Sequence, residues 1–496
     1  MNQSVIVVGA GIGGLTTALR LAVKGHRVQV VEKFHQAGGR LNQIKKDGFT
    51  FDTGPSFFSM SYEFKAFAKE CGIELPFSYV ELDPLYAVNF SNSDKTYLLH
   101  KNLQKLSEHF DGIEPDFEAK MEKYLAKCSG LFHDTVDLVI KQNFDSMMAY
   151  LLALVKVNPV HLPVLFRRFH TQVNRYFDSR EARQIISLVA FFLGRTPFDT
   201  SAIYTLLSYT EFRHDGYYNV EGGMYQIVEG LVDDLAKHNV SITFNTEITG
   251  FEQRNGKVTA LVDQHHHKWE ADAFVINADA AVFRGKVFNR SAFTPKKLDR
   301  MEWTMGYLTI YLGVKCKLPD VHHHNYFLGD NFYDYARDIY KKPDSLQKPY
   351  YYVNVLSKHN PHCAPEGCES LFFVCPVPDL RYKPDWNDRD AIVDSIIDDF
   401  SLRINKDIRS EIVSQTVFTP LEWQHHFNLY RGSGLGLAHN LMQIGAFRPK
   451  NYDEKFKNVF YVGASTIPGA GLPMAVISSK LVAQRVEGYF LKDDKR

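Results

Sequence analysis

Apolar residues in this chain are arranged in short runs that end at glycine-rich turns, most clearly near the N-terminus. The run Ser4 to Val8 leads into Gly9-Ala10-Gly11-Ile12-Gly13-Gly14, and a helical segment follows. A second run, Arg27 to Val31, ends in Glu32. Because strands of buried parallel sheets are short and continuously apolar, this order predicts a strand, a glycine turn, a helix and a second parallel strand.

The same pattern returns near the end of the chain. Asn458 to Gly463 is typical of a strand that ends in glycine, and the loop Ala464 to Gly471 follows it. Leu472-Pro473 then begin a predicted helix, because proline suits the first helical turn. Phe274 to Ala278 is another continuously apolar run. These segments predict that both ends of the chain enter one sheet.

The middle of the chain has two other patterns. Residues 131–209 have helical periodicity, whereas residues 300–420 are rich in β-branched and aromatic residues, which favours an antiparallel sheet. The predicted fold class is α/β, with a discontinuous Rossmann-like nucleotide-binding domain, an inserted antiparallel β substrate domain and a helical cap. The predicted ranges are 1–75, 215–282 and 440–496 for the nucleotide domain, 76–130 and 283–439 for the β domain, and 131–214 for the cap.

Length, charge and cysteine content narrow the classes of protein. A chain of 496 residues with 45% apolar content is expected to form two or three lobes with a sizeable core. A formal net charge of +0 argues against a broad nucleic-acid surface. The six cysteines form no CxxC motif, which favours a reducing, cytoplasmic compartment. We expect no signal peptide, because the first strand begins at once, and no run reaches the roughly 18 apolar residues of a membrane span.

The first strand, turn and helix carry a dinucleotide fingerprint. Gly9 permits the tight turn, Gly11 lets the backbone approach a pyrophosphate, and Gly14 lets the helix pack closely on the sheet. The helix N-terminus offers N–H groups and a partial positive charge to phosphates. Glu32 can accept hydrogen bonds from an adenosine ribose. This context predicts a nucleotide site, but it does not separate a nicotinamide cofactor from a flavin.

Further motifs distinguish between those cofactors. Together with the first glycine turn, Glu32-Lys33, Gly38-Gly39-Arg40 and Gly54-Pro55 resemble the amine oxidase and phytoene desaturase superfamily of flavin-dependent oxidoreductases. Residues 462–473, VGASTIPGAGLP, are similar to the C-terminal signature of bacterial carotenoid desaturases of the phytoene type. Matching motifs are spread along the whole chain and include Phe192-Leu193-Gly194, Ser201-Ala202-Ile203-Tyr204, Gly222-Gly223-Met224 and Ala364-Pro365-Glu366-Gly367.

The resemblance implies noncovalent FAD and a set of positions that bind it. The backbone of Ile248 matches the family position that contacts adenine, and Arg40 would assist the phosphates or the flavin. The helix that begins near Leu472 would place N–H groups beside the flavin pyrimidine edge, which becomes negative on reduction. The residues expected to bind FAD are Gly9, Gly11, Gly13, Gly14, Glu32, Lys33, Gly39, Arg40, Gly54, Pro55, Ser56, Ile248, Gly463, Leu472 and Met474.

The resemblance also implies a carotenoid desaturase that abstracts hydride from an acyclic C30 or C40 polyene and introduces C=C bonds. The alternatives are a 3,4-desaturase of 1-hydroxylated acyclic carotenoids, a polyene cis–trans isomerase, an oxidase of amines or porphyrinogens, and a non-enzymatic prenyl-lipid chaperone. Oxygen or a membrane quinone would accept the electrons. No catalytic acid or base is named, because Ile467 stands where most relatives have a histidine.

Residues 147–168 combine an apolar run, Met147 to Val155, with Pro159, Pro163 and basic residues. Composition alone equally allows a buried helical cap or a helix that lies in a membrane interface. Because carotenoids reside in membranes, the resemblance favours peripheral docking on the inner face of the membrane. Lys156, Arg167 and Arg168 would then meet anionic headgroups.

No metal site is expected. Histidines 265–267, 322–324 and 425–426 are interpreted as solvated turns, and Cys363 and Cys368 as part of a solvated loop. Gly432-Ser433-Gly434-Leu435-Gly436 lacks the Lys-Ser/Thr that follows a P-loop, so a phosphate loop is rejected. In the family that it resembles, this stretch lies on the substrate side near the flavin.

Overall fold

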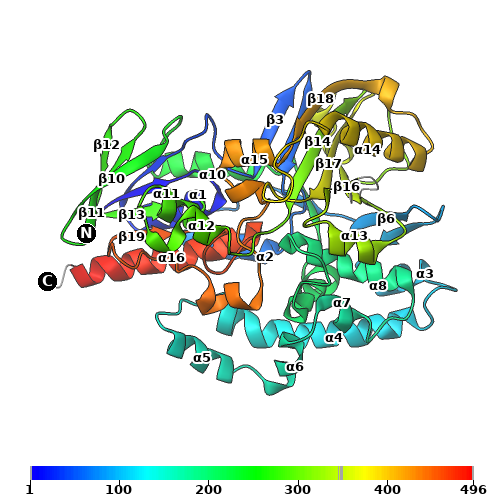
Figure 1. Ribbon diagram of the computed structural model, residues 1–496, viewed down its shortest axis with the longest axis horizontal. Coiled ribbons are helices and arrows are strands. Elements are labelled where there is room, and N and C mark those ends of the chain that lie inside the picture. The colour runs from blue at the N-terminus through cyan, green and yellow to red at the C-terminus, as the bar shows by residue number, and fades with distance from the viewer. Residues whose placement is uncertain (1–2, 344–345, 347–349, 494–496) are drawn as a thin grey trace.

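A five-stranded parallel sheet brings together the two ends of the chain (Figure 1). The computed structural model describes residues 3–343, 346 and 350–493, and the remaining positions of the predicted domain ranges lie outside the described residues. The strand order is β19-β13-β1-β2-β9, which confirms the shared sheet. The strands are β1 (Ser4–Val8), β2 (Arg27–Val31), β9 (Ser241–Thr243), β13 (Ala273–Ile276) and β19 (Val459–Tyr461).

Both faces of this sheet are covered, which explains why its strands are continuously apolar. Val5 and Val7 pack toward α1 (Ile12–Ala22), α10 (Gln226–Lys237) and α16 (Leu472–Asp493). The alternate residues Ile6 and Val8 pack on the opposite face, against a three-stranded antiparallel sheet. That sheet consists of β10 (Ile248–Arg254), β11 (Lys257–Asp263) and β12 (Lys268–Glu270), and its first two strands form a hairpin that turns at Asn255-Gly256.

A seven-stranded sheet forms the second lobe. Its order is β18-β14-β17-β16-β15-β6-β7, and all neighbours are antiparallel except β15 and β6. The largely antiparallel sheet predicted for residues 300–420 is therefore confirmed. Its strands are β6 (Tyr86–Phe90), β7 (Thr96–Leu99), β14 (Gly306–Val314), β15 (His324–Leu328), β16 (Tyr351–Val355), β17 (Glu369–Val377) and β18 (Ile412–Phe418).

Two short ribbons and several helices complete the fold. β4 follows β3 as a hairpin and packs against β17, while β5 pairs with β8. These ribbons and the remaining helices outside the cap are β3 (Asn42–Lys46), β4 (Phe49–Gly54), β5 (Tyr79–Glu81), β8 (Tyr218–Val220), α2 (Ser61–Cys71), α3 (Leu103–Glu108), α11 (Ala280–Lys286), α12 (Pro295–Leu298), α13 (Phe332–Asp338), α14 (Arg389–Arg403) and α15 (Pro420–Phe427).

Helices below the seven-stranded sheet form the cap (Figure 1). They are α4 (Phe117–Thr135), α5 (Met147–Val155), α6 (Leu162–Leu165), α7 (Phe169–Val173), α8 (Arg180–Ser187) and α9 (Leu206–Tyr209). The helical region thus begins at Phe117, earlier than the predicted position 131. Phe117, Met121 and Tyr124 form a narrow buried stripe with helical spacing, and the charged residues between them obscured it.

Two of the predicted solvated segments are wrong. His323, just before β15, and His324, its first residue, are buried, and His324 pairs with Asn354 on β16. Cys363 and Cys368 are also buried, and Cys368 belongs to an apolar cluster with Phe51. The local sequence of these short polar runs does not show that distant segments of the chain will bury them.

Candidate active site

The glycines after β1 leave no room for side chains. Gly9 has a φ of +100°, and a Cβ atom on it would lie 2.6 Å from the carbonyl oxygen of Asn277. A Cβ on Gly14 would lie 2.1 Å from the carbonyl oxygen of Gly9. A Cβ on Gly11 would lie 2.8 Å from Asn277 Oδ1. The turn and the start of α1 therefore require glycine, because the backbone packs directly against Asn277 and against itself.

Asn277, at the end of β13, was missed by sequence reasoning. Its Nδ2 donates a hydrogen bond to the carbonyl oxygen of Val462 at 3.1 Å. Its Oδ1 lies against the glycine turn and has no hydrogen-bond partner among the described residues. The side chain thus joins the ends of β1, β13 and β19 and leaves an acceptor for a ligand. The sequence signal that could have identified Asn277 is its position as a polar residue directly after a buried apolar run.

Glu32 lies at the end of β2, where its carboxylate accepts two main-chain hydrogen bonds. Ala10 N–H donates at 2.6 Å and Phe34 N–H at 2.8 Å. Burial raises the pKa of Glu32, and these donors oppose that rise. Each carboxylate oxygen retains lone-pair capacity for hydroxyl donors. Neighbouring Lys33 lines the same space, but its ammonium group donates to Asn428 Oδ1 at 3.1 Å.

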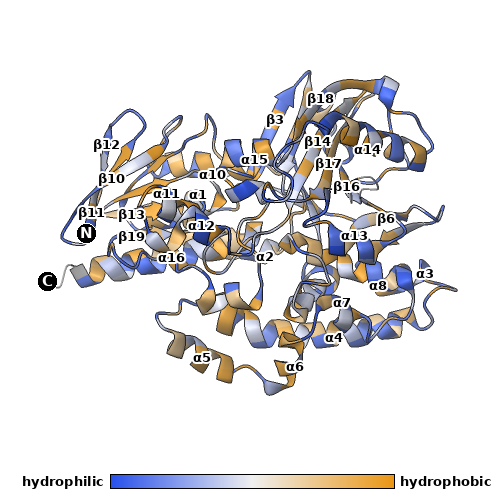
Figure 2. Ribbon diagram, viewed as in Figure 1, coloured by the Kyte–Doolittle hydropathy of each residue, from blue (hydrophilic) through white to orange (hydrophobic). Residues whose placement is uncertain are grey.

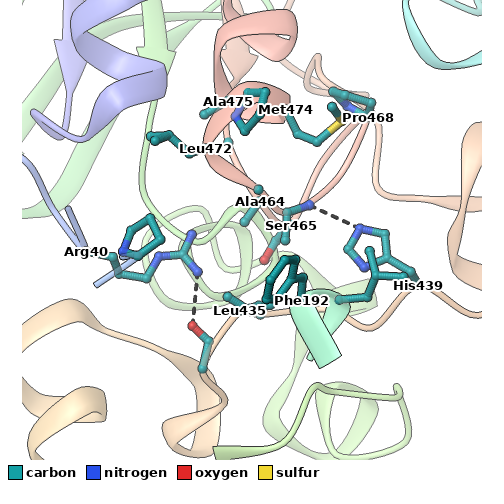
Figure 3. Close-up of a pocket in the computed structure, with 18 of the residues that line it drawn as sticks. Arg40, Phe192, Leu435, His439, Ala464, Ser465, Pro468, Leu472, Met474 and Ala475 are labelled. Atoms are coloured by element: carbon teal, nitrogen blue, oxygen red, sulfur yellow. Dashed lines mark hydrogen bonds between the residues drawn. The ribbon is translucent and has the colours of Figure 1, made fainter. Parts of the chain in front are cut away.

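Arg40 connects the glycine turn to the segment that precedes the closing motif. Its Nη1 donates to the carbonyl oxygen of Gly434 at 3.1 Å (Figure 3). Burial lowers the pKa of Arg40, while the nearby Asp279 carboxylate opposes this shift. Gly434, Leu435 and Gly436 line the same cavity as Arg40. The arginine is therefore held where its remaining N–H groups can meet an anionic or carbonyl group.

The loop before α16 is held by a fully buried arginine. Arg448 donates hydrogen bonds to five main-chain carbonyls, and burial lowers its pKa to about 10. The acceptors are the carbonyl oxygens of Leu437, Ala438, Gln443, Ala464 and Thr466. Two of these belong to the closing motif and three to the segment before it. Nothing in the local sequence distinguishes this arginine from a surface residue.

His439 fixes the same loop nearer to α16. Its Nε2 accepts a hydrogen bond from Ala470 N–H at 3.1 Å (Figure 3). Burial and the charges of Arg448 and Arg195 hold the pKa of His439 well below its usual range, so the imidazole is neutral and can accept. Figure 3 also shows Leu472 and Met474, at the start of α16, beside the same space.

One cavity joins these parts. It has a volume of about 990 Å³, and it is lined by fourteen of the fifteen predicted FAD-binding residues. Gly14 is the exception, since it packs beneath Gly9. Beyond the nucleotide-binding features the walls are mainly apolar and aromatic, with Tyr326 and Tyr335 on the sheet side and Leu154 on the cap side. Ile467 is buried in an apolar cluster beside α16 and also lines the cavity.

Comparison with known proteins agrees with this geometry. The model of the family "Flavin containing amine oxidoreductase" matches residues 12–487. The chain belongs to this family. It is an FAD-dependent oxidoreductase, and the glycine turn, Glu32 and the unpaired buried Oδ1 of Asn277 fit such a cofactor.

Two curated relatives and one solved structure illustrate the relationship. The chain is 32% identical to the zeta-carotene-forming phytoene desaturase of Myxococcus xanthus, over 98% of this chain and 94% of the relative. It is 29% identical to the 4,4'-diapophytoene desaturase (4,4'-diaponeurosporene-forming) of Staphylococcus haemolyticus, over 97% and 98%. An oxidoreductase from Methanosarcina mazei has the same fold, with a TM-score of 0.62 and 16% identity, over 97% of this chain and 100% of that one.

Proposed function

We propose that this flavoenzyme is a carotenoid desaturase of the phytoene desaturase type, which introduces C=C bonds into an acyclic polyene. The observation that carries the proposal is the long apolar cavity that continues from the nucleotide-binding turn into the aromatic wall of the second lobe. A polyene has no charged group to anchor, so apolar walls suit it. The activities named for the two curated relatives support the same substrate class.

The protein contributes binding, orientation and exclusion of water. When bound, FAD supplies the two-electron acceptor for a hydride. We assign the phosphates to the glycine turn after β1 and the ribose to Glu32. Main-chain N–H groups at the start of α16 would then face the flavin edge that becomes negative. Arg448 and His439 keep this helix start in place, and the apolar walls hold the polyene against the flavin in a dry space.

Purified enzyme is expected to convert an acyclic carotenoid into a product with a red-shifted absorption spectrum and two fewer hydrogens for each new double bond. The test is incubation of the holoenzyme with a panel that contains phytoene, 4,4'-diapophytoene and a 1-hydroxylated acyclic carotenoid, followed by absorption spectra and product mass. The panel also distinguishes a phytoene-type enzyme from a 3,4-desaturase. Products of unchanged mass would instead indicate an isomerase, and protein that purifies without FAD would indicate a lipid chaperone.

We further propose that the cavity opens onto a membrane. Figure 2 shows that α5 and α6 are composed largely of hydrophobic residues. These helices, the residues next to them and the segment before the closing motif carry exposed apolar side chains, which we call the apolar patch. The patch consists of Met147, Met148, Leu151, Leu152, Val155, Val160, Leu162, Phe166, Leu441, Met442 and Phe447. Five of these residues also line the cavity: Leu162, Phe166, Leu441, Met442 and Phe447.

A membrane fits this surface better than a protein partner does. Five exposed residues of the patch also line the cavity, and a water-insoluble polyene must enter from lipid. Basic residues lie beside it, because Lys156 and Arg168 are exposed and can meet anionic headgroups. Among the described residues no single helix is long and apolar enough to cross a membrane. α5 and residues 159–165 together have the length and composition of a membrane span, but the pair is bent by 99°. We propose peripheral docking on the inner face of the membrane, with oxygen or a membrane quinone as electron acceptor.

Replacement of Leu151, Leu152 and Val155 by serine is expected to abolish co-sedimentation with anionic vesicles, because it removes three exposed apolar side chains from the patch. Leu154 is left unchanged, since it lines the cavity. The control is Leu402→Ser, which changes a leucine on α14 in the second lobe that is more exposed (80%) than Leu151 (47%) and Leu152 (59%). Vesicle binding that survives the triple substitution, or that falls equally with the control, would contradict docking through the patch.

A further inference from the structure

Three hydrogen-bonded side chains extend from the cavity into the seven-stranded sheet. Ser56, just after β4, has its Oγ atom 2.8 Å from the hydroxyl of Tyr352 on β16. The Tyr352 hydroxyl in turn lies 2.5 Å from His324 Nδ1 on the neighbouring strand β15. Ser56 and Tyr352 line the cavity, whereas His324 lies behind them and is 1% exposed. The three groups therefore form a continuous polar path out of an otherwise apolar wall.

Asn354 sets the direction of these hydrogen bonds. Its Nδ2 donates to the carbonyl oxygen of His323 at 3.0 Å and also lies 3.3 Å from His324 Nδ1. An amide nitrogen only donates, so the Nδ1 atom accepts and the ring proton is assigned to Nε2. Tyr352 then donates its hydroxyl proton to His324 and accepts one from Ser56. Lone pairs of the Ser56 hydroxyl remain for a donor in the cavity.

The surroundings keep the imidazole of His324 neutral. Burial and the neighbouring His323 and His359 hold the pKa of His324 well below its usual range, so the ring is neutral before the reaction. Its ring stacks on Phe57 with the centroids 3.9 Å apart, which fixes its orientation. A ring that is hard to protonate still accepts a proton from a carbocation, since carbocations are very strong acids.

We propose that Ser56, Tyr352 and His324 form a relay that accepts the proton lost by the substrate during desaturation. The inference rests on the proposed function. Bound FAD would supply the acceptor for a hydride, so that one C–H bond of the polyene breaks with its electron pair leaving on hydrogen, and an allylic cation would remain. The neighbouring C–H bond then breaks, and its electron pair forms the new C=C bond. Its proton passes to Ser56 Oγ, the Ser56 proton to Tyr352, and the Tyr352 proton to His324 Nδ1.

Two other polar groups near the closing motif are already engaged. His439 Nε2 accepts the N–H of Ala470. The Asp279 carboxylate caps α11 and accepts the hydroxyl of Ser465. Ile467, in the closing motif itself, is apolar and offers no acceptor. The residues of the closing motif therefore offer no free proton acceptor, and the relay of Ser56, Tyr352 and His324 supplies one.

The test is Tyr352→Phe in the FAD-loaded enzyme. This change keeps the ring but interrupts the path between Ser56 and His324. General acid–base groups typically contribute about 10²-fold or more, so we expect turnover to fall by about that factor. The control is Tyr430→Phe, which removes a hydroxyl that is hydrogen-bonded to the Asp299 carboxylate outside the cavity. Tyr352→Phe should have the same flavin content and thermal midpoint as this control.

A merely structural role would not change which C–H bond limits the rate. With polyene deuterated at the carbon that loses the proton, the isotope effect should rise in Tyr352→Phe, while the effect at the hydride-donating carbon should fall. Ser56→Ala should change both isotope effects in the same directions. Because Ser56 lies outside the sheet, this variant provides the test if Tyr352→Phe is unstable. Turnover within threefold of wild type and unchanged isotope effects in both variants would overturn the relay. Wild-type enzyme that desaturates no polyene would instead overturn the proposed function.

A second readout needs no turnover. In holoenzyme with ¹⁵N-labelled histidine, the Nδ1 resonance of His324, assigned by its loss in His324→Gln, should carry the signature of an unprotonated acceptor. The resonance should shift when Tyr352→Phe removes the donor. A protonated Nδ1 in wild type, or no shift in the variant, would contradict the assigned direction of the hydrogen bonds.

Discussion

Gly14→Val is expected to yield protein that retains no FAD and has no measurable oxidoreductase activity. Even a Cβ atom at this position would lie 2.1 Å from the carbonyl oxygen of Gly9, and valine adds two methyl groups. The obstacle is main chain, so α1 must move away from the sheet that it packs on. The cost should therefore exceed the roughly 1–3 kcal/mol of ordinary overpacking. Flavin absorbance per protein after gel filtration, together with the thermal midpoint, measures both effects.

Gly488→Ala provides the matched control for that prediction. Gly488 lies within α16, and a Cβ on it would meet nothing within 4 Å. Alanine in a helix interior should stabilise the protein by about 0.5–1 kcal/mol relative to glycine. If Gly14→Val bound FAD as fully as Gly488→Ala does and unfolded at the same temperature, the tight contact between α1 and the glycine turn would be wrong.

Arg448→Met is expected to lower the free energy of unfolding by at least about 3 kcal/mol and to weaken FAD retention. Methionine fills much of the volume, but five main-chain carbonyls lose a hydrogen bond. The Ala438 carbonyl keeps a donor in Gln443 Nε2, whereas the buried carbonyls of Leu437 and Thr466 are left unpaired among the described residues. Each unpaired buried group costs about 1–3 kcal/mol. Relief from burying a charge offsets part of this loss. The loss should dominate, because the acceptors are main-chain groups in two separate segments. Urea unfolding with and without added FAD measures the change.

Two further variants sharpen this test. Arg448→Lys should also be strongly destabilised, because an ammonium group has three donors and cannot span both segments. Arg254→Ala, at an exposed position on β10, should change stability by less than about 0.5 kcal/mol. A stability for Arg448→Lys that equals wild type would show that charge, and not the number of hydrogen bonds, is what the loop requires.

The sequence predicted those parts of the fold whose signal is local. The strands around Val7, Val275 and Phe460 were recognised because burial on both faces makes a strand continuously apolar. The glycine turn was recognised because close packing and positive φ require glycine. Helix α4 was located too late, because its apolar stripe is narrow. These successes and this failure follow from how completely each segment is buried by its neighbours.

The polar interior could not be predicted in the same way. Asn277 and Tyr352 acquire their roles from partners far away in the chain, and Arg448 acquires its role from the folding of two loop segments around it. His324 was interpreted as solvated because it follows two other histidines. Its burial depends on Tyr352 and Asn354 of the adjacent strand. Hydrogen-bond networks of this kind become visible only when strand pairing and register are known.

The parallel sheet also constrains how the protein is made. β1 and the glycine turn leave the ribosome early, but β19 and α16, which complete the same site, are synthesised only after both lobes and the cap. A nascent chain therefore displays half of a nucleotide pocket throughout most of translation. A premature stop codon near the 3' end of the message would remove α16, the helix proposed to face the flavin, although nearly all of the protein would have been synthesised.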